Sequence, residues 1–280
     1  MVCGRQFLGG LRIRNEDLWR DFRVGKQTYR QLAEKHRCSI RTIQRRLDRI
    51  KAESGGFKGG ARPGSVVLLM DTTYFGRDFG VLLIKSAHTD EVLHREYVKQ
   101  ETNALYERAV EGLKARGFKI AAIVCDGRKG LFSVFGETPV QMCQFHQSAI
   151  VTRYLTRRPK TLASYQLREL ALTLSRTDRQ SFTDGLFSWH DEWKTFLNER
   201  TVNPETGKST FTHRRLRSAY RSLKANLPWL FTFEDHPDLG IPNTTNALEG
   251  TFADLKNKLR CHNGLTKQRR MKFIDEFLKA

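Results

Sequence analysis

Apolar positions in residues 15–50, "NEDLWRDFRVGKQTYRQLAEKHRCSIRTIQRRLDRI", recur at helical spacing and predict three short helices. Thr28 and Ser39 precede the second and third of these helices and can cap them, because their hydroxyls accept an early backbone N–H. The break at "HRCS" is about as long as the turn of a helix-turn-helix motif. The side chains expected to share the three inner faces are Leu18, Trp19 and Phe22, then Tyr29, Leu32 and Ala33, then Ile40, Ile43 and Leu47.

Beyond residue 65, β-branched apolar runs replace the helical spacing. The runs "VVLLMDTTYF", "GVLLIKSA" and "EVLHREYVK" predict three strands joined by short turns, which favours antiparallel neighbours. Residues 102–118 predict a helix with Leu105, Ala109 and Leu113 on one face, and "KIAAIVCDG" predicts a buried strand. Three strands, a helix and a strand follow one another in the order of a ribonuclease-H-like α/β sheet core.

The rest of the chain divides by composition. Residues 51–65, "KAESGGFKGGARPGS", are rich in glycine and predict a linker. Residues 147–240 predict a mainly helical segment, and 244–260 and 266–279 predict two more helices. We therefore expect a small all-α domain at 15–50 and an α/β domain at 66–280, with a helical insertion at about 150–240.

The net charge indicates the partner. The chain has 49 Lys and Arg against 30 Asp and Glu, which gives a formal charge of +19 and a pI of about 10.0. Such a chain attracts polyanions by releasing counterions from their phosphates, so nucleic acid is the expected partner. Ribosomal proteins and other structural RNA binders share this composition, and charge alone does not separate an enzyme from a scaffold.

The hydropathy and the cysteines indicate the compartment. No apolar run approaches the roughly 20 residues of a membrane helix, and "MVCGRQFLGG" lacks the apolar region of a signal peptide. The five cysteines are odd in number and scattered, which favours a reducing compartment. We expect a cytoplasmic protein without a membrane partner.

The third predicted helix carries the candidates for DNA contact. In a helix-turn-helix domain, the polar side of this helix meets bases and phosphates. The alternative is an ordinary helical bundle with a basic, solvated face; the spacing and the charge together favour DNA binding. The candidate side chains are Arg41, Thr42, Gln44, Arg45 and Arg46.

Cys143 and His146, in "QMCQFHQ", have the spacing of half a zinc site. A closed zinc site needs four ligands, usually as two such pairs. Only the adjacent Cys261 and His262 could complete it, and neighbouring residues rarely both face one ion. The residues therefore favour a buried thiol with a histidine beside it.

Asp71 follows five apolar residues and Asp126 follows six largely apolar ones, so both stand at predicted strand ends. Side chains at strand ends line the crevice where α/β sheets bind ligands, and the two carboxylates can converge there. Each also has a simpler explanation, because Asp71 can cap the turn into "TTYF" and the Asp-Gly of "CDGRKG" is a common turn dipeptide.

A third acid, Glu249, changes that balance. The predicted helix at 244–260 places Asn246 and Glu249 on one face, so Glu249 can point inward with Asn246 one turn away. Three carboxylates supply hard oxygen ligands for a pair of Mg²⁺ ions, which clamp the attacking and leaving oxygens of a phosphoryl displacement. The predicted active group is therefore Asp71, Asp126 and Glu249.

The blocks "MDTTYF", "CDGRKGL", "QMCQFHQ" and "PNTTNALEGTFADLKNKLRCHNGL" resemble, in order, those of the Mutator-like DDE transposases of bacterial insertion sequences. The resemblance covers about residues 66–279, and its last block is the most specific. It implies a ribonuclease-H-like catalytic domain in which Asp71, Asp126 and Glu249 hold two Mg²⁺ or Mn²⁺ ions. It also implies binding to double-stranded DNA, both terminal inverted repeats and target, as a dimer in the bacterial nucleoid.

The same resemblance places Cys143 and His146 beside the active site. His146 would then contact the scissile phosphate or position a ligand, with Cys143 packed behind it. "VCGRQFLGG" resembles the second half of the zinc ribbon that some insertion-sequence transposases carry, but the first cysteine pair is absent. Residues 1–14 are thus expected to be a remnant, from a truncated product or a start placed late, since Cys3 alone cannot build a ribbon.

Two rival functions remain open. Another two-metal nuclease of the same fold, such as a junction resolvase, explains the three acids but not the helix-turn-helix or the insertion. The non-enzyme rival is a regulator, either a DNA-binding segment joined to a domain with structural acids or a domesticated transposase, and it would be favoured if Asp71→Ala left all activity intact.

Trp229 is a candidate for stacking on an unpaired base, because arginine, lysine and aromatic residues alternate along the insertion. The alternative is that Trp229 fills the core of the insertion together with Leu227, Leu230 and Phe231.

Overall fold

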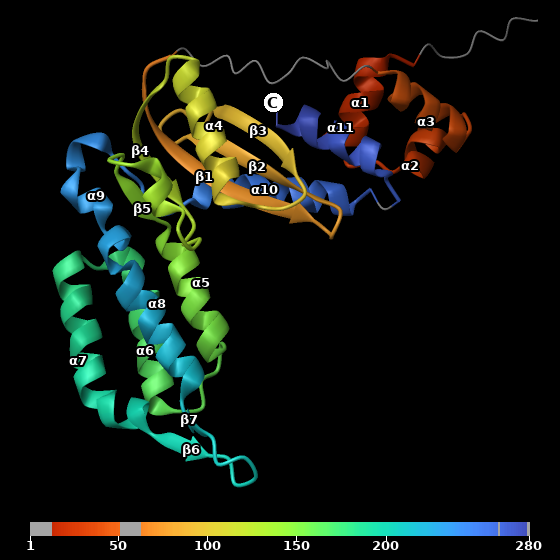
Figure 1. Ribbon diagram of the computed structural model, residues 1–280. Coiled ribbons are helices and arrows are strands. Elements are labelled where there is room, and N and C mark those ends of the chain that lie inside the picture. Colours follow the sequence, from red (N-terminus) through yellow and green to blue (C-terminus); the bar gives the residue numbers. More distant parts are fainter. Residues whose placement is uncertain (1–12, 51–62, 263, 279–280) are drawn as a thin grey trace, which may run out of the picture. The chain divides into compact units, whose positions relative to one another are not determined.

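A computed structural model describes residues 13–50, 63–262 and 264–278, which fall into two compact units (Figure 1). One unit spans residues 59–249, and the other joins the residues up to 58 with those from 250 onward. The expected ribbon remnant with Cys3 and the expected linker lie outside the described residues, apart from positions 13, 14 and 63–65. None of the helices in the described ranges combines the length and apolar character needed to cross a membrane.

Five strands form one mixed sheet in the unit of residues 59–249, in the order β3-β2-β1-β4-β5. The pairs β1–β2 and β2–β3 are antiparallel, as expected, and the pairs β1–β4 and β4–β5 are parallel. This α/β architecture is compatible with a ribonuclease-H-like fold. The strands are β1 (Ser65–Phe75), β2 (Phe79–Ser86), β3 (Val92–Val98), β4 (Lys119–Cys125) and the short β5 (Val140–Met142), which the sequence pattern did not predict.

Alternation along β1 decides which side chains meet the helix α4 (Asn103–Ala115), which lies against one face of the sheet (Figure 1). Met70 belongs to the apolar core that α4 shares with the sheet. Because successive side chains of a strand point to opposite faces, Leu69 and Asp71 point away from α4. Thr102 caps α4 through its hydroxyl. The predicted inner face is buried, at Leu105, Ala109 and Leu113.

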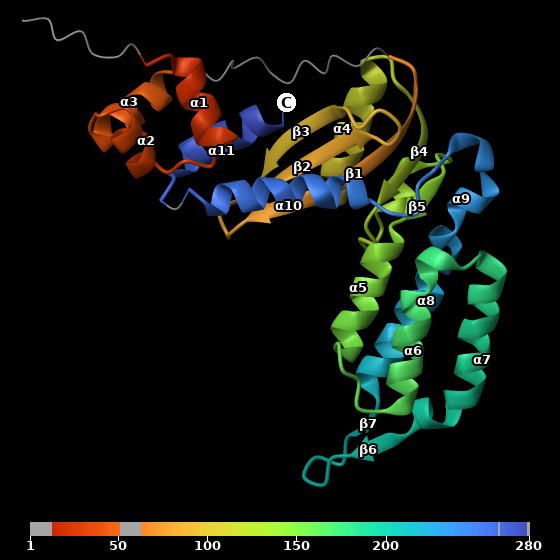
Figure 2. The ribbon, with the colours of Figure 1, turned by 180° about the vertical axis from the view of Figure 1, so that it is seen from behind.

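The insertion is a set of packed helices with its own apolar core (Figures 1 and 2). α5 packs against α6 and α8, and α7 packs against the same two helices. The prediction of a mainly helical segment is confirmed, but a small hairpin interrupts it, formed by β6 (Arg200–Val202) and β7 (Ser209–Phe211). The helices are α5 (Gln144–Leu155), α6 (Leu162–Leu172), α7 (Arg179–Asn198), α8 (Arg214–Leu230) and α9 (Thr232–Asp235), with single 3₁₀ turns at Phe132–Phe135, Leu174–Arg176 and Pro237–Leu239.

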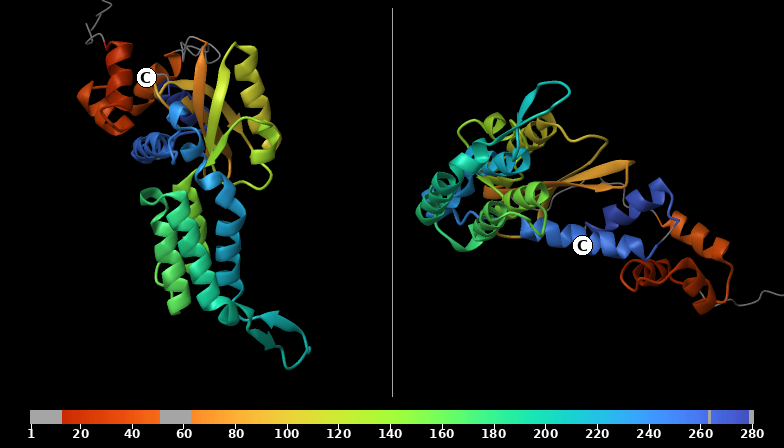
Figure 3. Two further views of the ribbon diagram at one scale, coloured as in Figure 1. Left: turned by 90° about the vertical axis from the view of Figure 1, so that its left-hand side faces the viewer. Right: turned by 90° about the horizontal axis from the view of Figure 1, so that it is seen from below.

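The other unit contains the three predicted N-terminal helices (Figure 3). Thr28 caps the second in a capping box with Gln31, and Ser39 caps the third, as predicted. Leu32 and Ile43 are fully buried, but Ile40 is 45% exposed because it is the first residue of its helix. The helices are α1 (Asn15–Arg23), α2 (Tyr29–Lys35) and α3 (Ile40–Arg49).

The C-terminal helix α11 (Lys267–Phe277) packs on these three helices. Arg269 donates two hydrogen bonds to the carboxylate of Asp48, at 2.8 and 2.7 Å. The ring of His262 packs on those of Phe22 and Phe273 in tilted arrangements, with centroid distances of 4.1 and 5.4 Å. The sequence did not predict this packing, since it joins residues more than 200 positions apart.

Candidate active site

The parallel pairing of β1 with β4 brings two acids together. Leu69 pairs with Val124, and Asp71 and Asp126 each lie two residues further along. Neighbouring strands are about 4.8 Å apart, so both side chains leave the same face at the same level. Asp126 directly follows β4, as predicted. The predicted strand end at Asp71 is wrong, because β1 continues to Phe75 alongside β2.

A buried corner connects α5 to the segment before α10 (Asn246–Arg260). The backbone N–H of Gln144 donates to the carbonyl of Asn243 at 2.9 Å. The sulfur of Cys143 accepts hydrogen bonds from the backbone N–H and the hydroxyl of Thr245, both at 3.3 Å. Cys143 and Thr245 are fully buried, so these contacts fix where α10 begins.

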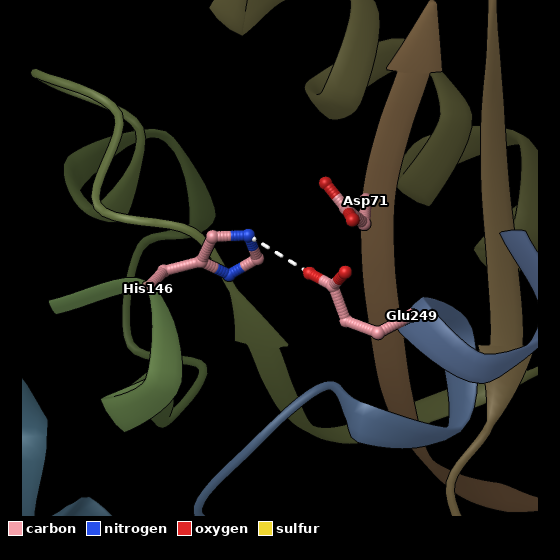
Figure 4. Close-up of side chains that lie close together, drawn as sticks. All are labelled: Asp71, His146 and Glu249. Carbon is pink, nitrogen blue, oxygen red and sulfur yellow. Dashed lines mark ion pairs between the residues drawn. The ribbon is translucent and has the colours of Figure 1, made fainter. Parts of the chain in front are cut away.

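Thr245 in turn positions Glu249. The Thr245 carbonyl accepts the backbone N–H of Glu249 at 3.1 Å, which is the first helical hydrogen bond of α10. His146 lies in the first turn of α5, at the other side of the corner. Its Nε2 is 3.0 Å from Oε1 of Glu249 (Figure 4). Cys143 is therefore a buried acceptor that sets the distance between His146 and Glu249.

Asp71, His146 and Glu249 form a three-residue group around one point (Figure 4). One ligand atom from each lies within 4.8 Å of the others. Within the described residues, Asp126 is not part of this group, although its charge acts on Asp71. The structure thus brings together two of the three predicted acids and adds His146.

Burial and the neighbouring charges shift the pKa values of Asp71 and His146. Burial raises the pKa of Asp71 to about 7; His146 opposes this rise, and the carboxylates of Glu249 and Asp126 add to it. Burial alone would lower the pKa of His146, but Cys143 and the two carboxylates of the group raise it to about 11. The free site therefore holds a proton on His146 and, below about pH 7, another on Asp71.

Hydrogen bonds also act on the Cys143 thiol. Burial raises its pKa, but the neighbouring His146 and the hydrogen bonds from Thr245 outweigh burial and leave the pKa below its usual value. Nδ1 of His146 is buried and has no hydrogen-bond partner among the described residues. Cys125, by contrast, is buried and its pKa is raised well above the usual value.

A second network, which the sequence pattern did not reveal, lies beside Asp126. The backbone N–H of Arg128 donates to Asp126 at 3.3 Å, and its guanidinium donates to the carbonyl of Glu101 at 2.8 Å. Tyr106 donates to the Glu101 carboxylate and lies 2.9 Å from the hydroxyl of Thr72. Burial raises the pKa of Glu101; its hydrogen bond from Tyr106 opposes this, and Asp126 adds to it. In the sequence, this network is indicated only by Arg128, directly after "CDG", and by Glu101, shortly before α4.

The cluster fits a divalent cation. Carboxylate oxygens suit Mg²⁺ and Mn²⁺, and an imidazole nitrogen suits Mn²⁺ better than Mg²⁺. Metal–oxygen bonds of about 2.1 Å put opposite ligands about 4.2 Å apart, close to the 4.8 Å span of the group. The raised pKa of Asp71 agrees with this, because a bound cation would stabilise the charged carboxylate that burial, and to a lesser degree the neighbouring carboxylates, disfavour.

The other candidate residues lie outside the cluster. Asn246, the first residue of α10, is exposed. Trp229 is 36% exposed, with its ring 4.8 Å from that of Phe132, while Leu230 and Phe231 fill the core. The suggested core position of Trp229 is therefore wrong.

The candidates on α3 differ in exposure. Arg41 and Arg45 are exposed, whereas Thr42, Gln44 and Arg46 are half-buried. The hydroxyl of Thr42 lies 3.0 Å from that of Ser39, and the guanidinium of Arg46 donates to the carbonyl of Ile13 at 3.0 Å. Arg41 and Arg45 are thus the most accessible to a ligand.

No family model matches the chain. No curated protein matches it either. Among solved structures, it is similar to a chain in the cryo-EM structure of the simian T-cell lymphotropic virus intasome in complex with PP2A regulatory subunit B56 gamma, with a TM-score of 0.24 and 10% identity. The match covers 68% of this chain and 60% of that one, so this chain spans less than two thirds of the matched chain's length. A likeness at that TM-score supports no conclusion about the fold or the function.

Proposed function

We propose that the chain is a DNA transposase that binds the ends of an insertion sequence and catalyses metal-dependent strand cleavage and strand transfer. The observation that carries the proposal is the grouping of Asp71, Glu249 and His146 within 4.8 Å, on a chain with a net charge of +19. An acidic site in a strongly basic protein suits a cation-assisted reaction on a polyanion. The mixed sheet and the motif resemblance to Mutator-like DDE transposases support the same class, with a ribonuclease-H-like catalytic domain.

In this proposal Asp71, Glu249 and Asp126 would hold two Mg²⁺ or Mn²⁺ ions. When bound, these ions polarise the scissile phosphate and increase the acidity of the attacking hydroxyl. The new P–O bond would form from water or from a DNA 3′-hydroxyl, which loses its proton to solvent water, and the leaving oxygen would depart with the electron pair of the broken P–O bond. His146 is placed to hold a proton at Nε2, facing either Glu249 or a phosphate oxygen. Cys143 holds this imidazole and Glu249 at a fixed distance through its hydrogen bond with Thr245.

The α3 side chains Arg41, Thr42, Gln44, Arg45 and Arg46 would bind the terminal repeats in the major groove. Asn246 would support the start of α10, and Trp229 would meet DNA near the cut. A dimer on DNA, acting in the bacterial cytoplasm, belongs to the same proposal.

The test is strand cleavage of duplex DNA that carries inverted repeats and flanking sequence. Cleavage with Mg²⁺ or Mn²⁺, its loss in EDTA, and joining of the freed 3′ end to a second duplex are the expected results. Cleavage of branched junctions in preference to linear ends would favour a structure-specific nuclease. Tight binding to the ends with no cleavage in either metal would favour a regulator.

A further inference from the structure

A groove with a volume of about 510 Å³ lies between residues of α5, the turn that follows α5 and the end of α6. Its first residue, Phe145, directly precedes His146, and the two rings are 5.9 Å apart at 72°. Phe145 is 53% exposed, so its ring is accessible to a ligand. The residues that line it are Phe145, Ser148, Ala149, Thr152, Arg153, Thr156, Arg157 and Leu172.

The lining has a regular order. Phe145, Ser148, Ala149 and Thr152 lie at the i, i+3, i+4 and i+7 positions of α5, so they form one stripe on the helix. The stripe starts with an exposed ring, continues with small side chains and hydroxyls, and ends at the two exposed arginines. Proteins bind single-stranded nucleic acid with groups of these kinds. Flat rings stack on the bases, small hydrogen-bonding side chains suit the sugars, and cations bind the phosphates.

The charge of the groove is of one sign. Among the described residues that line it, Arg153 and Arg157 are the charged ones. No ion pair involves either arginine in the described part of the chain. Both guanidinium groups therefore remain available to phosphates, which bind arginine through two donors at once.

We propose that this groove binds the single DNA strand that adjoins the scissile phosphate, with Phe145 stacked on the first unpaired base and Arg153 and Arg157 on the following phosphates. The inference rests on the proposed function for the presence of a scissile phosphate at Asp71 and Glu249. The twelve residues from Phe145 to Thr156 span about 17 Å at 1.5 Å per residue. That length matches about five nucleotides if the bases remain stacked at roughly the 3.4 Å spacing of duplex DNA.

The experiment measures binding in EDTA, so that it does not depend on cleavage. The probe is a fluorescein-labelled twelve-nucleotide oligo-dT with the full chain, followed by anisotropy at several salt concentrations. Phe145→Ala tests the ring, and Phe145→Leu keeps apolar volume without a stacking surface. Phe187→Ala is the matched control, because Phe187 is 44% exposed on α7, the helix on the other side of the α6–α8 pair.

For the phosphates, the double variant Arg153→Ala/Arg157→Ala is compared with Lys99→Ala/Lys119→Ala, which removes the same charge from two exposed lysines of the sheet region. Both Phe145 variants should weaken binding by at least about fivefold, the lower end of what one stacked base contributes. The arginine pair should make the log–log salt dependence shallower by about 1.4. A 5-iodouracil oligonucleotide should crosslink at Phe145 in the wild type.

Unchanged affinity in both Phe145 variants, or equal losses in the groove and control variants, would overturn the proposal. Melting temperatures accompany each variant, and Phe145→Leu keeps the test valid if Phe145→Ala unfolds. The two proposals fail separately. If duplex ends are not cleaved with Mg²⁺ or Mn²⁺ but the groove variants lose affinity, the proposed function fails and the groove stands; if cleavage occurs and Phe145 has no effect on binding or crosslinking, only the groove fails.

Discussion

The cluster at Asp71 and the outer face of α3 are both candidate contacts with DNA, but they are built in opposite ways. His146 and Glu249 are held 3.0 Å apart by fully buried groups at Cys143 and Thr245. Arg41 on α3 is exposed on the helix surface. A catalytic site with fixed geometry depends on a few atoms, so a single substitution there has a large effect. Binding to an exposed cationic face is shared among many side chains, so each substitution has a small effect. Chemistry and binding should therefore respond to substitution separately.

The largest effect is expected from the acids. Asp71→Asn and Glu249→Gln keep the shape of each side chain but remove its charge, so cleavage should fall by about 10²–10³ or more, the loss typical of one essential electrostatic group. Binding to end DNA should change little, because neither residue is on α3. Asp126→Asn tests the acid that stands outside the 4.8 Å group. Gel-shift and cleavage assays on the same preparations give both values.

Asp71→Asn should also leave the melting temperature equal or raise it, because it removes a carboxyl whose charged form is disfavoured by burial. A variant that loses both end binding and melting temperature would contradict the separation of chemistry from binding, and would show a structural role for Asp71.

The next effect concerns the buried corner. Cys143→Ala leaves the N–H and the hydroxyl of Thr245 without their acceptor, which should cost about 1–3 kcal/mol of the free energy of unfolding. Cleavage should fall as well, because Thr245 sets the start of α10 and hence the place of Glu249. Cys143→Ser retains an acceptor and should recover part of both losses. Urea unfolding and the cleavage rate are the measurements.

Cys261 provides the control for the corner. Its sulfur is exposed near the end of α10, so Cys261→Ala should change stability by no more than about 0.5 kcal/mol. If Cys143→Ala proved as mild as Cys261→Ala, the sulfur would not be what positions Glu249.

A smaller effect is expected from pH. Burial raises the pKa of Asp71 from 3.8 to about 7, so its contribution to stability is full below 3.8 and is lost as pH rises through about 7. The loss is at most about 4 kcal/mol, at roughly 1.4 kcal/mol per pKa unit. Mg²⁺ competes with this proton and should therefore stabilise the protein more at pH 8 than at pH 5. Melting temperatures across pH, in EDTA and in Mg²⁺, measure both trends.

Asp71→Asn is the reference for that pH series, since it cannot titrate at this position. The informative quantity is the difference between wild type and variant at each pH, because other groups titrate equally in both. Parallel curves from pH 4 to pH 8 would show that the Asp71 carboxyl is not perturbed.

The sheet and its covering helix were predictable because their signals are local. The apolar run before Asp71 and the helical spacing of Leu105, Ala109 and Leu113 lie within single elements, and the structure confirms each. The three-residue strands β5, β6 and β7 were not predicted, because a period of two residues cannot be recognised in so short a run.

The candidate site was predictable in its residues but not in its geometry. Asp71, Glu249 and His146 came from motif resemblance and from position within predicted elements. The bond from Thr245 to Cys143 joins residues 102 positions apart, and no periodic pattern reports such a contact. The run "VVLLMDTTYF" includes the part of β1 after Asp71, but Asp71 itself was placed at the end of the strand, because "TTYF" can also follow it as a turn.

The smallest effect is expected on α3, where single side chains act additively. Arg41→Ala or Arg45→Ala should make the log–log salt dependence of end binding shallower by about one unit for each phosphate that the variant no longer binds, with no change in melting temperature. Arg46→Ala should in addition lower the melting temperature, because its guanidinium donates to the carbonyl of Ile13. Arg20→Ala, an exposed arginine on α1, is the control.

Cleavage at saturating protein should stay the same in the Arg41 and Arg45 variants, because occupancy of the ends is then complete and the cluster at Asp71 is intact. If chemistry and binding are separate, these variants should bind the ends more weakly but still reach saturation. Their cleavage rate at saturation should then equal that of the wild type. If the saturated rate fell together with the salt slope, the arginines would act on the reacting strand itself. Equal slopes in wild type, Arg41→Ala and Arg45→Ala would instead remove α3 from the DNA interface.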